Sequence, residues 1–252
     1  MDRRTAAIGP AGALLGMALL AAAAQAAGEK ILLARHLKQG AVATYKGTIK
    51  TNLGGTDIEL SLSQKQTIKV LKDNGTYVVL SEDLGGAIKV DGKEEPQMPS
   101  NPSTETRDKS GKLVDFAQEL DANPVYTPEI HRLMIAMREL VLSDKEVAEG
   151  DAWDTLLDNP VIAESKAKVK TVYQGIDKIG GVDAWKFKQT AEAVVNADGS
   201  KMTNESTIWV NPKDGLTEKI EGKIKDLPTV TGPIDIVMTI VRARPADGAK
   251  AQ

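Results

Sequence analysis

The stretch from Asp57 to Lys72 alternates like a β-strand of unusual length. Every second residue is apolar on one face, except where two glutamines, Gln64 and Gln66, interrupt it. That face holds Ile58, Leu60, Leu62, Ile68 and Val70. A strand of about fifteen residues spans about 50 Å. Such a length suits a strongly curved sheet better than a compact sandwich, and one face of a curved sheet needs a cover.

Alternating segments recur from about Val42 to Val90 and again from Ala167 to Val241. Short turns such as Asp73-Asn74-Gly75 join most neighbouring segments, which indicates antiparallel pairing. No strand–helix–strand alternation is present, so a parallel sheet is not expected. Residues 94–106 contain three prolines and predict a loop.

A different period begins at Thr127-Pro128-Glu129, which has the hydroxyl cap, first-turn proline and early acid of a helix start. Apolar residues then follow at helical spacing as far as Val141, and the helix is expected to end near Leu142. The predicted fold class is mainly β (α+β), a single curved antiparallel sheet or half-barrel with a mid-chain helical cover.

The N-terminus has the features of a secretory signal peptide. Arg3 and Arg4 precede an uncharged run from Ala11 to Ala23, and Ala24-Gln25-Ala26 offers small residues for cleavage. We expect a signal peptide at 1–26, an N-terminal arm at 27–40 and a disordered tail at 244–252. A single β-rich domain is expected at 41–243, with a helical insert at about 128–158. The pair of arginines leaves Sec and twin-arginine export open.

The composition excludes several classes of function. The chain has no cysteine, so a lipid-anchoring thiol, a disulfide scaffold and a cysteine nucleophile are not expected. A formal charge of -3 with interspersed signs gives no reason to bind nucleic acid. The two histidines, His36 and His131, lack the neighbours of a catalytic triad or a zinc site and are interpreted as surface residues. We therefore predict no catalytic residue, metal or cofactor.

The order of elements, together with the segment "GGVDAWKFKQTAEAV…STIWVNPKDGLTEKIEGKI", resembles the LolA/LppX-like exported half-barrel proteins. In that segment Trp209, Val210, Asn211 and Gly215 match a strand-ending turn common in the group, which bears on fold and not on function. The resemblance implies a concave hydrophobic surface that could hold an acyl chain. It carries over no specific functional residue.

These observations leave two hypotheses open. The first is an exported, non-enzymatic binding protein of the cell envelope, soluble and periplasmic or extracellular, that holds a lipid or other hydrophobic ligand between sheet and helix. The second is a structural or protein-interaction module with a filled core; a hydrolase, a third class, lacks a nucleophile–base pair. Gln64 and Gln66 would face either a partly wet concave surface or, if the pattern shifts at a bulge, solvent. The expected cavity lining is Leu60, Leu62, Gln64, Ile68, Leu133, Met134, Met137, Trp185 and Phe187.

Overall fold

The computed structural model describes residues 29–119 and 125–244, which contain fourteen strands and one helix. The predicted signal peptide, 1–26, and all but the first residue of the predicted tail lie outside them. The first seven strands are β1 (Ile31–Leu32), β2 (Val42–Leu53), β3 (Thr56–Leu71), β4 (Tyr77–Val90), β5 (Lys93–Gln97), β6 (Ser103–Arg107) and β7 (Leu113–Gln118). After the helix α1 (Pro128–Arg138) come β8 (Glu146–Val147), β9 (Ala152–Asp158), β10 (Lys166–Ile179), β11 (Val182–Val194), β12 (Lys201–Val210), β13 (Thr217–Thr229) and β14 (Gly232–Ala243).

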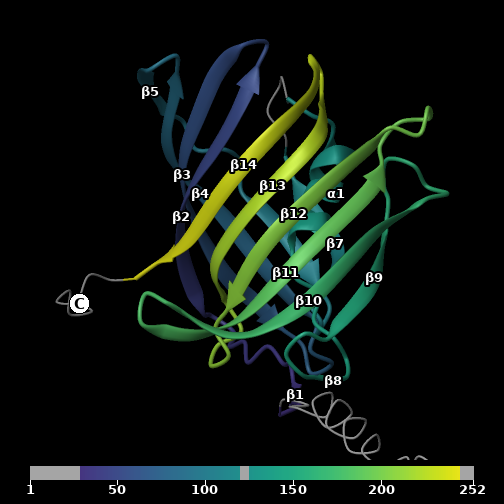
Figure 1. Ribbon diagram of the computed structural model, residues 1–252. Coiled ribbons are helices and arrows are strands. Elements are labelled where there is room, and N and C mark those ends of the chain that lie inside the picture. Colours follow the sequence, from purple (N-terminus) through teal and green to yellow (C-terminus); the bar gives the residue numbers. More distant parts are fainter. Residues whose placement is uncertain (1–28, 120–124, 245–252) are drawn as a thin grey trace, which may run out of the picture.

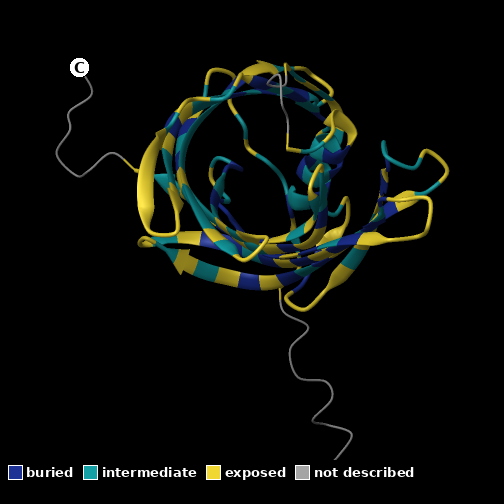
Figure 2. Cartoon of the chain, turned by 90° about the horizontal axis from the view of Figure 1, so that it is seen from above, coloured by how far each residue is buried: buried dark blue, intermediate teal, exposed yellow. Residues whose placement is uncertain are grey.

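Twelve of these strands form one antiparallel sheet, in the order β7-β6-β4-β3-β2-β14-β13-β12-β11-β10-β9, with β5 paired to β4. The sheet bends round on itself, and α1 lies inside the bend (Figure 1; Figure 2). β1 and β8 pair separately. The predicted fold class, a curved antiparallel sheet with a helical cover, is confirmed.

The register shows which side chains share the inner face of the bend. Residues directly opposite each other in antiparallel strands point to the same side. One unbroken row of such pairs crosses six strands and reads Gln189, Ser206, Gly222, Met238, Ile49 and Leu60. Because the Gln189 side chain bonds to helix α1, the whole row, including Leu60 of the long strand β3, faces the helix side.

Helix α1 begins where the sequence predicts and ends earlier. Thr127 Oγ1 accepts a hydrogen bond from the Ile130 backbone N–H at 3.3 Å, and Pro128 occupies the first turn. Glu139 takes an extended conformation, so the predicted end near Leu142 is wrong. Leu140, Val141 and Leu142 are buried in a segment without regular secondary structure, which explains their apolar character without a helix.

Two further segments differ from expectation. The helical insert does not reach 158, because residues 152–158 form strand β9, whose Trp153 and Leu157 pair inward against β10. The predicted loop at 94–106 contains β5 and β6, which pair with successive parts of β4. Two of its prolines, Pro99 and Pro102, lie between these strands.

The Asn211-to-Gly215 segment is a tight turn, as the sequence indicated. The Gly215 N–H donates to Asn211 O at 2.8 Å, and the Asn211 Nδ2 donates to the buried Glu218 at 2.9 Å. Arg242 completes the cluster, 2.7 Å from the Asp214 carboxylate. The N-terminal arm packs beside this turn, where Arg35 donates to Gly215 O and Leu140 O.

Candidate ligand-binding face

Helix α1 packs most closely against β11 and β12 on the inner face. The buried amides of Gln189 in β11 and Asn204 in β12 both donate to Met137 O, at 2.8 and 3.1 Å. Leu133 and Met137 of the helix are 0% and 1% exposed. The part of the sheet formed by β10–β12 is therefore a filled core.

Elsewhere on the inner face, one end of β3 and the adjoining part of β4 carry apolar side chains that point inward without joining this core. Ile58, Leu60 and Leu62 of β3 and Ile88 of β4 are partly exposed, and all four lie outside the hydrophobic core cluster of the described residues. Their pairing, Leu60 with both Ile49 and Ile88, places them on the helix side of the sheet. We call these four residues the inner patch.

Glycines explain why Leu62 stays partly exposed. Its cross-strand partners are Gly47 on β2 and Gly86 on β4, so no side chain flanks it on either side. A Cβ at Gly86 would lie 1.8 Å from Ser61 O, so only glycine fits that approach of the two strands. The missing side chains leave apolar surface of β3 unpacked.

The predicted cavity lining therefore divides into two groups. Leu60, Leu62 and Gln64 lie on the partly exposed part of the inner face. Met134 is half-buried on α1. The others are buried in packed regions: Ile68, Leu133, Met137, Trp185 and Phe187.

The two glutamines of β3 lie on the inner face. Gln64 and Gln66 pair with Tyr45 and Ala43, which are both buried, and each glutamine is half-buried. Gln66 Nε2 donates to Gln64 Oε1 at 3.4 Å. Of the two orientations that the sequence allowed, the inward one is observed.

His131 lies between two aromatic rings rather than on the open surface. Its ring centroid is 5.1 Å from that of Phe116 on β7 and 5.2 Å from that of Tyr126. Burial, with a smaller effect of Arg138, lowers the pKa of His131 from 6.5 to about 4, so the imidazole is neutral at pH 7. The interpretation as an ordinary surface histidine was wrong, because the sequence does not show that β7 comes to pack against α1.

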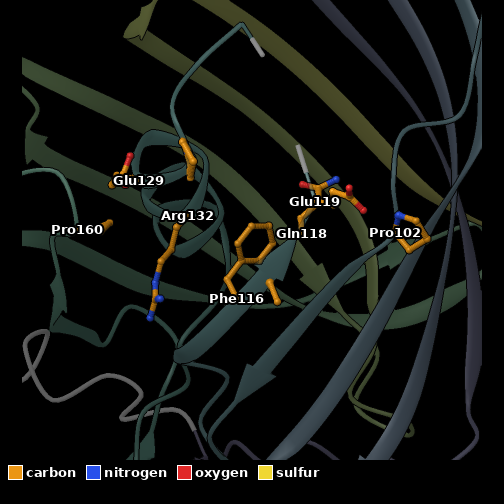
Figure 3. Close-up of a pocket in the computed structure, with 9 residues that line it drawn as sticks. Pro102, Phe116, Gln118, Glu119, Glu129, Arg132 and Pro160 are labelled. Atoms are coloured by element: carbon orange, nitrogen blue, oxygen red, sulfur yellow. The ribbon is translucent and has the colours of Figure 1, made fainter. Parts of the chain in front are cut away.

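A hollow of about 600 Å³ opens where the end of β7 meets the start of α1. Phe116, Gln118 and Glu119 lie between Glu129 and Arg132 of the helix on one side and Pro102 on the other (Figure 3). Aromatic, proline and polar side chains share its wall, which is a mixture suited to an amphipathic molecule.

Beyond the C-terminal end of α1, buried charges tie the helix to β6. Arg107 forms hydrogen-bonded ion pairs with Glu105 and lies 3.8 Å from Glu139, which also accepts from Arg138 at 3.0 Å. Burial alone would raise the pKa of Glu139, but Arg107 and Arg138 outweigh it and lower the pKa from 4.5 to about 2. These groups satisfy one another, which is typical of a structural cluster.

Within the described ranges, no three His, Asp or Glu side chains gather as a metal site would require. The helix that the structure describes, eleven residues long, is too short to cross a membrane.

Comparisons with known proteins add little. No family model and no curated protein matches the chain. Among solved structures, the hypothetical lipoprotein YmcC from Escherichia coli is 14% identical, with 85% of this chain and 91% of that chain covered at a TM-score of 0.25. A DUF1329 family protein from Desulfovibrio piger is 10% identical, with coverages of 84% and 88% and a TM-score of 0.26.

A domain described as an outer membrane lipoprotein-sorting protein, from Vibrio parahaemolyticus, is 7% identical, with coverages of 85% and 89% and a TM-score of 0.22. All three TM-scores are below 0.3, and the half-barrel resemblance stays a prediction.

Proposed function

We propose that the protein is an exported, non-enzymatic binding protein that holds a lipid or other hydrophobic ligand on the partly exposed part of its inner face. The observation that carries this proposal is the inner patch, whose four apolar side chains point into the bend but stay outside the core. Exposing them to water costs about 25 cal/mol per Å² of apolar surface, which a bound apolar group would recover. The signal peptide expected at 1–26 would deliver the protein to the envelope.

The test places a charge in the inner patch. Leu62→Glu should weaken binding of a neutral naphthylamine dye roughly tenfold or more, because a carboxylate in an apolar site is costly. The measurement is a fluorescence titration of the purified protein. Since Leu62 is half-exposed, we expect the variant to fold, with an unchanged circular dichroism spectrum.

The matched control is Ser61→Glu, which adds the same charge one residue away on the exposed outer face. It should bind dye like the unaltered protein. Equal binding by both variants would contradict the proposal. Met137→Glu would not serve as a test, because Met137 is 1% exposed in the packed part and the change would unfold the protein.

A second candidate function, a protein-interaction module with a filled core, is favoured by the tight packing between α1 and β10–β12. Native mass spectrometry of the purified protein separates the two. Co-purifying lipid supports the binding protein, whereas a clean apo mass with no dye uptake supports the module.

A further inference from the structure

We propose that the ligand carries an uncharged hydrogen-bonding group, held by a row of four polar side chains on the inner face. Gln66 of β3, Ser81 of β4, Ser103 of β6 and Gln118 of β7 are successive cross-strand partners. We call them the polar row. This inference rests on the proposed function and deepens it by naming the chemistry of the ligand.

The polar row lies on the same face as the inner patch and close to it. Leu62, Gln64 and Gln66 are every second residue along β3 and share one face. Leu62 of the inner patch and Gln66 of the polar row are therefore four positions apart, which is about 13 Å along the strand. At its other end the row reaches Gln118, which lines the hollow beside α1 (Figure 3). A single molecule with an apolar end and a polar end could contact the inner patch with the first and the polar row with the second.

Two members of the row have hydrogen-bonding capacity that the described residues leave unused. Ser81 is 2% exposed, and its Oγ has no partner among them. The Gln118 Nε2 donates to Asn101 O at 2.8 Å, but its buried Oε1 has none. A buried polar atom without a partner destabilises the fold, and a polar group of a ligand would relieve this.

The charges around the row argue against an anionic head group. Asp83, Glu119 and Glu129 lie near it, and none of them forms an ion pair within residues 29–119 and 125–244. Asp83 is the cross-strand partner of Gln64 and accepts only from Ser100 and the Gly85 N–H.

The nearby cations are already engaged. Arg107 is paired with Glu105, and Arg132 donates to Val114 O and approaches Asp115 at 3.7 Å. Arg35, which lines a small cavity together with Gln66, donates to Gly215 O and Leu140 O. A carboxylate or phosphate would therefore meet a surplus of negative charge. Hydroxyl, ester and amide groups fit the row, and a monoacylglycerol combines hydroxyl and ester groups with an apolar chain.

The experiment compares two probes that differ only in their head group, monoolein and oleate, as competitors of the naphthylamine dye. Monoolein should displace the dye from the unaltered protein at a concentration roughly tenfold lower than oleate. Ser81→Ala and Gln66→Leu should each weaken monoolein about fivefold and leave dye binding unchanged, since about 1 kcal/mol is lost with each hydrogen bond. Ser61→Ala, on the outer face of β3, is the matched control and should change neither monoolein competition nor dye binding.

The outcomes separate this inference from the proposed function. If the dye binds but oleate competes as well as monoolein, or the two row variants leave monoolein unchanged, the polar row is not the head-group site and the proposed function stands. If neither dye nor lipid binds, both fail. Ser81→Ala removes a hydroxyl without a partner, so its fold should be retained, and a thermal melt verifies this.

Discussion

Glu139 follows helix α1 directly and lies between the guanidinium groups of Arg138 and Arg107. Their attraction outweighs burial and holds the pKa of the Glu139 carboxyl at about 2. A carboxyl whose pKa is lower in the folded than in the unfolded protein stabilises the fold above the unfolded value of 4.5. This stabilisation is lost as the pH falls through about 2.

Replacing the Glu139 carboxylate should therefore lower the free energy of unfolding most at neutral pH. We expect Glu139→Gln to lower the free energy of unfolding by on the order of 3 kcal/mol at pH 7, and by progressively less between pH 4.5 and pH 2. Urea unfolding across this pH range measures it. Glu59→Gln, which breaks an exposed pair with Lys50, should change stability by less than about 1 kcal/mol at any pH. A loss for Glu139→Gln that does not vary with pH would contradict this account.

Single residues also show where sequence reasoning stops. The alternation of β3 placed Leu60, Leu62 and Gln64 on one face, and the register confirms it. The polar row could not be foreseen, because its four members come from four strands and meet only through the register. For the same reason the aromatic neighbours of His131 were missed.

At the scale of elements, two side-chain hydrogen bonds to one backbone carbonyl hold the last turn of α1. Met137 O is one of the carbonyls that a helix leaves without an internal partner at its C-terminal end. It accepts from two buried amides, those of Gln189 and Asn204. The helix is thus fixed to β11 and β12 by side chains as well as by apolar packing.

Because the two amides share one carbonyl, their contributions should not be additive. Gln189→Leu or Asn204→Leu alone should lower the free energy of unfolding by about 1 kcal/mol, since the other donor remains. The double variant should lose more than the sum, because Met137 O is then buried without a partner. A double-mutant cycle by urea unfolding measures this, with the exposed outer-face change Thr190→Ala as the control. Strictly additive losses would show that the two amides act independently.

Element boundaries followed the sequence where local chemistry sets them. The cap at Thr127 and the turn at Asp73-Asn74-Gly75 are local, and both were predicted. The end of the helix and strand β9 were not predicted. Leu140 and Leu157 are apolar because they are buried in the tertiary structure, and a buried apolar residue can belong to a helix, a strand or a loop. Strands β5 and β6 form because β4 offers each of them an edge, which proline content alone does not reveal.

For the whole molecule, the lengths of the strands predicted the bend, and the single strong helical period predicted its cover. What the sequence did not show is that the cover leaves Ile58, Leu60, Leu62 and Ile88 outside the core. The β10–β12 part packs against α1, whereas the inner patch stays partly exposed and the polar row beside it is largely buried.

The chain contains no cysteine, so one introduced cysteine reports directly on the inner face. The decisive measurement is the rate at which a maleimide labels Leu62→Cys, with and without saturating dye, compared with Ser61→Cys on the outer face. We predict that both sites label in the free protein and that the dye slows labelling at 62 alone. Labelling at 62 that the dye leaves unchanged, or that it slows equally at 61, would contradict a ligand bound on the inner face.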